Sequence, residues 1–227
     1  MPDHSYVPER PQKLSGPLDH VLQVLHILEK TYPDAHCALH FNSPFQLLVA
    51  TILSAQCTDI RVNLVTERLF LSYPDADSLA EVDQTVLEDV IRSTGFFRNK
   101  AHSLIACARM IRDRHNGQVP SSLEELTELP GVGRKTANVV LGNAFQIPGM
   151  VVDTHVKRIS FRLGWTKNTD PNKIEMDLGR ILPEKKWVEA SHLLIFHGRR
   201  ICKAPVPICS ECPVAPYCPK KGLKKSR

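Results

Sequence analysis

Lys135 and Asp153 are the residues of this chain whose types and positions best suit covalent chemistry. Lys135 directly follows Leu129-Pro130-Gly131-Val132-Gly133-Arg134, and Asp153 comes eighteen residues later. In the first turn of a helix, a lysine faces the positive end of the helix dipole, which favours the neutral amine. Because only the neutral amine attacks carbon, Lys135 is a candidate Schiff-base nucleophile with Asp153 as a nearby carboxylate. Asp153 also fits as the N-cap of a helix that starts near Thr154.

The residues before Lys135 predict a hairpin between two helices. Ser121 with Glu124, and Ser122 with Glu125, have capping-box spacing for a first helix, which Pro130 would end. Both hairpin glycines are expected to allow positive φ, and a second, buried helix begins at Arg134. The backbone amides would then hold a phosphate without reading a base, through Gly131, Val132, Gly133 and Arg134. An ordinary turn between packed helices fits the same pattern.

Four cysteines near the C-terminus form a second chemical cluster. Six, two and five residues separate Cys202, Cys209, Cys212 and Cys218. Disulfides are a poor explanation because nothing else marks a secreted protein, so metal ligation is the better one. Zinc more often uses two Cys-x-x-Cys pairs, whereas one pair with longer flanking spans suits a four-iron cluster. The spacing favours iron–sulfur and leaves zinc open.

The distribution of charge along the chain is more informative about phosphate binding than the net charge is. The chain carries +5, but its last nine residues alone supply five cations and no acid. Residues 75–89 are acidic, whereas residues 98–114 carry five basic side chains and one acid. This polarity predicts either a basic face turned to phosphates or two separate solvated helix faces.

Hydrophobic periodicity predicts an all-α fold in which helices place these residues. Residues 1–17 are proline-rich and are expected to be a flexible tail. Helices are predicted from Leu18 to Pro33 and over 45–53, 60–71, 78–92, 98–115, two segments within 121–146, 154–163, 172–181 and 187–196. No secretion signal or long apolar run is present, so we expect a cytoplasmic protein that does not enter membranes.

Together these residues resemble the endonuclease III family of helix–hairpin–helix DNA glycosylases, over nearly the whole predicted helical region. The matching segments are Leu53–Asp59, Gly95–Ala101, Leu129–Val140, Val152–His155, His197–Arg199 and the four cysteines. The resemblance implies a bifunctional DNA glycosylase/AP lyase that excises oxidised pyrimidines from damaged double-stranded DNA during base excision repair. It also implies a monomeric bacterial protein associated with the nucleoid through DNA.

The resemblance assigns roles to individual residues. Lys135 would attack the sugar and form a Schiff base, Asp153 would assist, and β-elimination would cut the strand 3′ to the lesion. Gln56 would fill the space left by the rotated nucleotide, and Phe96 would wedge the opposite strand. The four cysteines would hold a [4Fe-4S] cluster that acts as a structural staple.

The resemblance also implies two helical domains that flank a DNA-binding groove. Residues 36–148 would form a six-helix barrel with the helix–hairpin–helix at about 121–146. Residues 18–35 and 149–219 would form the iron–sulfur domain, followed by a basic tail over 220–227.

Some assignments stay open. Phe96 is larger than the aliphatic residue usual in the family, and it fits either a wedge or the core. His155 fits DNA backbone contact or a structural position, and Arg199 fits a buried ion pair or, as the less favoured alternative, direct DNA contact. The loop over 203–208 has one charge, whereas this loop tends to be basic in the family. A non-enzymatic DNA-binding module and an iron–sulfur redox sensor are the other function classes; neither needs an amine at a helix N-terminus.

Overall fold

The computed structural model describes residues 16–227, and these residues form helices, turns and loops without a strand. This confirms the predicted all-α class. The chain divides into two compact units: Cys37–Gly149 is one, and residues 16–36 with 150–227 make the other. The predicted tail over 1–17 falls almost wholly outside the described residues. Helix α1 begins at Pro17, the last residue assigned to that tail. No helix in residues 16–227 has the length and apolar content needed to span a membrane.

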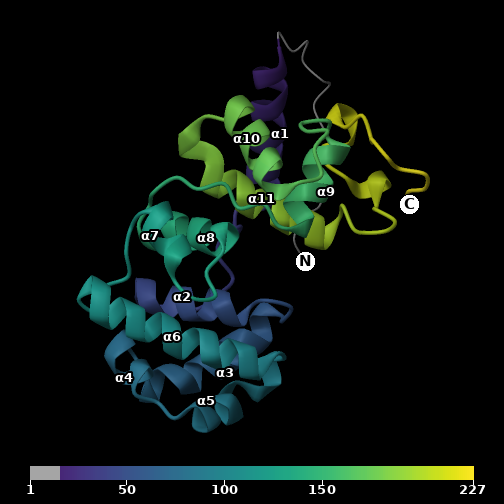
Figure 1. Cartoon of the computed structure of the whole chain (residues 1–227). Helices are drawn as coiled ribbons and strands as arrows, with labels where there is room; N and C mark the ends of the chain where they lie inside the picture. Colours follow the sequence, from purple (N-terminus) through teal and green to yellow (C-terminus); the bar gives the residue numbers. More distant parts are fainter. Residues whose placement is uncertain (1–15) are drawn as a thin grey trace. The chain divides into compact units, whose positions relative to one another are not determined.

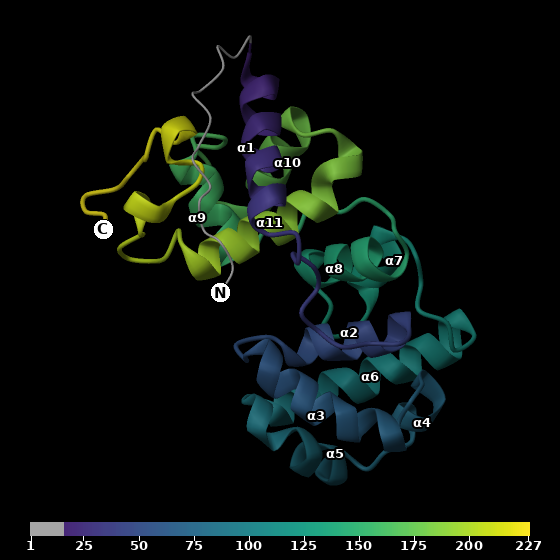
Figure 2. The ribbon, with the colours of Figure 1, turned by 180° about the vertical axis from the view of Figure 1, so that it is seen from behind.

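The unit of Cys37–Gly149 is built around a buried helix, α2. Its helices are α2 (Pro44–Leu53), α3 (Asp59–Ser72), α4 (Ala76–Ala80), α5 (Gln84–Ile91), the short turn η1 (Arg92–Thr94), α6 (Phe97–His115), α7 (Leu123–Glu128) and α8 (Arg134–Ala144). Every residue of α2 from Leu47 to Leu53 is buried, and α3, α6 and α8 pack against it (Figures 1 and 2). Truncating one of these leucines to alanine would cost about 2–5 kcal/mol of stability.

The prediction of a single helix over 78–92 is wrong, because the structure forms two helices there, α4 and α5. Asp83 is the N-cap of α5, and its carboxylate accepts hydrogen bonds from Thr85 N and Val86 N. Asp75 begins α4 in the same way, with a capping box to Ser78. Apolar periodicity runs through both helices, so it hid the capping signal at Asp83.

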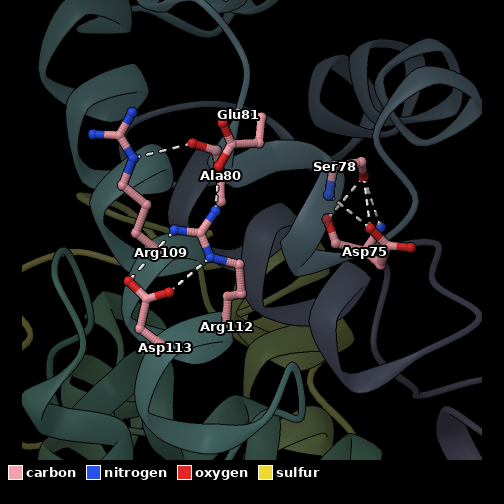
Figure 3. A network of polar contacts seen from close by, with 7 residues as sticks. All are labelled: Asp75, Ser78, Ala80, Glu81, Arg109, Arg112 and Asp113. Atoms are coloured by element: carbon pink, nitrogen blue, oxygen red, sulfur yellow. Dashed lines mark hydrogen bonds and ion pairs between the residues drawn. The ribbon is translucent and has the colours of Figure 1, made fainter.

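The acidic and basic segments predicted to form separate faces instead pack together. Helix α6 lies against α4 and α5, and Figure 3 shows Arg112 between Glu81 and Asp113, with both of which it forms ion pairs. Arg109 Nε donates to the carbonyl of Ala80, 3.0 Å away, at the C-terminal end of α4. The α6 cations are thus used to hold neighbouring helices, and the prediction of a segregated basic face is wrong for Arg109 and Arg112.

The other unit joins one early helix to the last third of the chain. It contains α1 (Pro17–Thr31), α9 (Thr154–Arg162), α10 (Pro171–Ile181), the turn η2 (Glu184–Lys186), α11 (Trp187–Arg200) and the turns η3 (Cys209–Glu211) and η4 (Ala215–Tyr217). Helix α1 packs against α10 and α11, and α9 packs against α11. Gly198 permits the second contact, since a Cβ there would lie 2.7 Å from His155 Nδ1 and 2.9 Å from Ile159 Cδ1.

The C-terminal segment, residues 219–227, folds back on this unit. Lys221 N donates to Arg162 O at 3.1 Å, and Arg227 N donates to Pro207 O at 2.9 Å. Ser210 N in turn donates to Arg227 O at 3.0 Å. The stretch expected as a basic tail is therefore anchored by main-chain hydrogen bonds and leaves its lysines at the surface of the unit.

Candidate active site and cysteine cavity

The hairpin between α7 and α8 depends on Gly131. Its φ of +79° favours glycine, and a Cβ would lie 2.8 Å from Ser103 Cβ on α6. Of the two predicted pairs, Ser122 and Glu125 is the one that caps α7: the Ser122 hydroxyl accepts from Glu125 N and donates to the Glu125 carboxylate. The hairpin is therefore fixed by a cap before it and by close packing under its turn.

Gly133 differs from Gly131, and the prediction of positive φ at both glycines is wrong. Gly133 is the N-cap of α8 with φ −94° and ψ 172°, an extended conformation. A Cβ built at Gly133 has no protein atom within 4 Å. The space beside the first turn of α8 is open, and no side chain caps the helix. Such an end attracts an anion through backbone N–H groups and the helix dipole.

Lys135 is exposed in this first turn. Its ammonium group makes no hydrogen bond or ion pair with the described residues of its own unit. Arg134 beside it is also exposed. Val132, by contrast, has its side chain in the core and donates its amide to Leu129 O at 3.0 Å. Of the residues predicted to hold phosphate, Val132 therefore supports the turn from inside.

Asp153 is the N-cap of α9, as the structural interpretation of the sequence predicted. Its Oδ1 accepts hydrogen bonds from His155 N and Val156 N, both at 2.8 Å. Its side chain is half-buried, and Oδ2 has no hydrogen bond to the described residues of its own unit. One carboxylate oxygen is thus committed to the helix, and the other is available to a second partner.

His155 is held inside its unit rather than displayed. Arg158 Nη2 lies 3.1 Å from His155 Nδ1 and also donates to Gly198 O at 3.0 Å. Burial lowers the pKa of His155 despite the charge of Asp153. These contacts favour the structural position for His155.

Gln56 and Phe96 both stand on left-handed backbone at the surface of their unit. Their φ values are +54° and +49°, and neither residue is glycine, so both conformations are unfavourable. Gln56 is exposed, and Phe96 is 63% exposed. The interpretation of Phe96 as a core residue is therefore wrong. The structure presents an amide and an aromatic ring from two loops of one unit.

The four predicted metal ligands gather around one cavity in the α9–α11 unit. Cys202, Cys209, Cys212 and Cys218 line it, together with apolar side chains and Leu223 of the C-terminal segment. Burial, and to a smaller extent the other three cysteines, raise the pKa of the Cys212 thiol to about 12. No three His, Cys, Asp or Glu side chains within residues 16–227 are arranged to hold a single metal ion. We call this space the cysteine cavity.

Sequence reasoning missed the arginine that organises the cysteine cavity. Arg162 is buried, and its Nη1 donates to Cys202 O at 3.3 Å, Cys202 Sγ at 3.2 Å and Lys203 O at 2.9 Å. Arg158 Nε donates to Cys202 O as well, at 3.0 Å. Arg199, predicted in a buried pair, is instead exposed. Arg158 and Arg162 lie about forty residues before Cys202 in the chain, and no local pattern connects them.

Comparison with known proteins gives consistent matches. Residues 49–184 match the family model described as HhH-GPD superfamily base excision DNA repair protein. Endonuclease III of Synechocystis sp. is 53% identical over 209 residues, covering 92% of this chain and 95% of the relative. Endonuclease III of Escherichia coli is 39% identical over 203 residues, with coverage of 88% and 95%.

Two solved structures agree with these relatives. A non-covalent endonuclease III–DNA complex has a TM-score of 0.85 and 44% identity, covering 89% of this chain and 95% of that one. A trapped endonuclease III–DNA covalent intermediate has the same TM-score and identity, with coverage of 89% and 96%. The resemblance predicted from the residues is confirmed, and the chain belongs to the endonuclease III family within the HhH-GPD superfamily of base excision DNA repair proteins.

Proposed function

We propose that this chain excises oxidised pyrimidines from double-stranded DNA with Lys135 as nucleophile and cuts the strand 3′ to the lesion. As a member of the endonuclease III family it is a DNA glycosylase with AP lyase activity in base excision repair. The observation that carries the assignment to Lys135 is its place: it is an exposed lysine in the first turn of α8, two residues after the N-cap Gly133, which has no side chain.

Lys135 would serve both chemical steps. Its neutral amine forms a bond to C1′ as the bond from C1′ to the base breaks, and the base leaves with a proton. Opening of the sugar ring then gives a Schiff base, which makes the C2′ hydrogen acidic. Loss of that proton expels the 3′ phosphate, and water finally releases the lysine.

Asp153 would stabilise the positive charge that develops on the sugar or accept the proton of the attacking amine. Its Oδ2 suits this role, since Oδ1 is occupied by two backbone amides of α9. An ionised carboxylate that is held by its own helix cap keeps a fixed direction, and fixed charges contribute more to transition-state stabilisation than mobile ones.

The duplex would be held by its backbone and opened at one nucleotide. The first turn of α8 and the amides near Gly131, Gly133 and Arg134 would bind phosphate. Rotating a nucleotide out of the stack costs a few kcal/mol. Gln56 would enter the vacated space, and Phe96 would stack in the opposite strand. We propose His155 as a support of this region rather than a main DNA contact.

The four cysteines would hold a [4Fe-4S] cluster as a structural cofactor. The donor set fits, because four thiols line one cavity and Arg162 and Lys220 N direct N–H groups at the sulfurs of Cys202 and Cys218. Such a cluster would cross-link the turns and loops over residues 202–218. Zinc is the competing assignment. We propose that this protein acts on DNA in the bacterial cytoplasm and that it does so as a monomer.

Borohydride trapping on duplex DNA with one abasic site tests the nucleophile. Wild-type protein should become covalently joined to the labelled strand, and Lys135→Gln should lose trapping and strand cleavage. The variant should keep its affinity for the duplex within about threefold, because phosphate contacts come from backbone amides and other side chains. Trapping by Lys135→Gln would remove the assignment. Wild-type binding without trapping would favour a DNA-binding module, and a cluster without DNA affinity would favour a redox sensor.

A further inference from the structure

We propose that Lys100 is a positioning residue that fixes Gln56 and Phe96 relative to one another for entry into the duplex. The proposal rests on the function proposed above, because it concerns how these two side chains meet DNA. Lys100 itself is buried and is not expected to touch DNA.

Lys100 joins the two loops directly. Its side chain is 6% exposed, and its Nζ donates to Leu53 O and to Thr94 O, both at 2.8 Å. Leu53 ends α2 three residues before Gln56, and Thr94 precedes Phe96 by two. The backbone amide of Lys100 donates to Phe96 O at 3.1 Å. One residue therefore contacts the loop of Gln56, the approach to Phe96 and Phe96 itself.

The burial of Lys100 without an ion pair is unusual for a lysine that only fills space in the core. Lysine is rarely buried unless it is paired, yet no carboxylate within residues 37–149 forms an ion pair with Lys100. Burial lowers its pKa. Its hydrogen-bond partners are two carbonyl oxygens, at the C-terminal ends of α2 and η1. An apolar side chain at position 100 would leave both without this donor.

The backbone conformations of Gln56 and Phe96 explain why these two exposed residues need support. Both Gln56 and Phe96 have left-handed backbone, which relaxes unless the surroundings determine it. Two side chains that enter one opened base pair must arrive at a set separation. A rigid link between their loops keeps that separation before DNA arrives, so less ordering is needed when the complex forms.

The test compares duplex with single-stranded DNA, since a gap has to be filled only in a duplex. Cleavage at one abasic site would be measured for wild type and for Lys100→Met, which keeps most of the length of the side chain and removes its donors. We expect the duplex-to-single-strand ratio of kcat/KM to fall about tenfold, within the range found for coupled neighbouring residues. Lys100→Gln, which keeps one donating amide, should show a smaller fall, and Lys100→Arg should restore most of the ratio.

A double-mutant cycle separates positioning from folding. Lys100→Met should have little further effect on the ratio when Gln56 and Phe96 are already alanine, because the residues it positions are gone. Leu104→Ala, a core truncation one turn along α6, is the matched control: it should lower stability without changing the ratio. An equal loss on both substrates, or full additivity in the cycle, would overturn the proposal. Failure of wild type itself to cleave either substrate would instead sink the proposed function.

Discussion

In the proposed function, Asp153 uses one carboxylate oxygen for structure and the other for chemistry. Oδ1 accepts from two amides at the start of α9, which satisfies part of the donor set that every helix N-terminus leaves open. The cap also directs the carboxylate, so the structural and catalytic interpretations of this residue do not compete. The two roles differ, however, in the charge that they need. A neutral amide oxygen can cap a helix, but it stabilises a cation less well than a carboxylate does.

Asp153→Asn should separate these demands. Asparagine caps helices about as well as aspartate, so the free energy of unfolding should change by less than about 1 kcal/mol. The single-turnover rate should fall about 10²–10⁴-fold, the range for a positioned acid–base group. Asp153→Ala is the matched variant, and it should lose both rate and about 1 kcal/mol of stability. A variant that keeps its rate but unfolds more easily would reduce Asp153 to a cap.

At the scale of elements, the hairpin contains two glycines that are present for different reasons. Gly131→Ala should destabilise the protein by about 1–3 kcal/mol, since it combines a φ of +79° with a Cβ contact of 2.8 Å. Gly133→Ala meets no protein atom within 4 Å and should cost less than about 1 kcal/mol. The new methyl group would, however, occupy the space proposed for a phosphate oxygen.

Urea unfolding and DNA titration of both variants would check this contrast. Gly133→Ala should weaken binding about tenfold with near-normal stability, as expected when a phosphate loses one or two backbone donors. Gly131→Ala should lose mainly stability. Equal affinity of Gly133→Ala and wild type for duplex DNA would show that this end of α8 does not approach phosphate.

The Asp83 cap between α4 and α5 predicts that the stability of the protein depends on pH in the acid range. Hydrogen bonds from Thr85 Oγ1, then from the amides of Thr85 and Val86, lower the pKa of Asp83. A carboxyl with a lowered folded-state pKa contributes stability above its ordinary pKa of 3.8 and loses it as the pH falls through the folded value. Asp83→Asn caps without titrating, so the variant should lose less stability than wild type between pH 4 and pH 2. An equal loss of stability in wild type and Asp83→Asn across this range would contradict the assignment of the pH dependence to Asp83.

The elements that were predicted correctly are those with local signals. Ser43, Ser122 and Asp153 cap α2, α7 and α9 close to where capping residues and apolar periodicity place helix starts. The features missed depend on distant partners. Lys100 reaches a carbonyl 47 residues away, and Arg162 reaches the cysteine cavity across 40. A single sequence shows only that these residues are basic, so their burial against carbonyl oxygens had no local signature.

At the scale of the whole molecule, residues 16–227 contain two hydrophobic cores that would serve different parts of the proposed chemistry. One core surrounds α2 and supports Lys135, Gln56 and Phe96 in the unit of Cys37–Gly149. The other surrounds α1, α9 and α11, and Cys202, Cys212 and Cys218 pack against it. Loss of the proposed cluster should therefore destabilise first the second unit, which also contains Asp153.

Cys212→Ser tests this division. The purified wild-type protein should be yellow-brown, with about four irons and four sulfides per chain, and the variant should be colourless. Residues 197–227 have few buried side chains apart from His197 and Val214, so they should depend on the proposed cluster much as small metal domains depend on zinc. Hydrogen exchange in the variant should accelerate in residues 150–227 and stay near wild type in 37–149.

Cys57→Ala, in the other unit, is the matched control and should keep both colour and exchange pattern. Activity of Cys212→Ser should fall although Lys135 is intact, because Asp153 belongs to the unit that loosens. The decline should exceed that of a stability-matched core variant such as Leu104→Ala, whose lesion lies in the other core. One zinc and no iron in the wild-type protein would replace the cofactor and leave the lysine chemistry standing. Uniform acceleration of exchange in both units would show that the two cores unfold together, and the division of labour between them would fail.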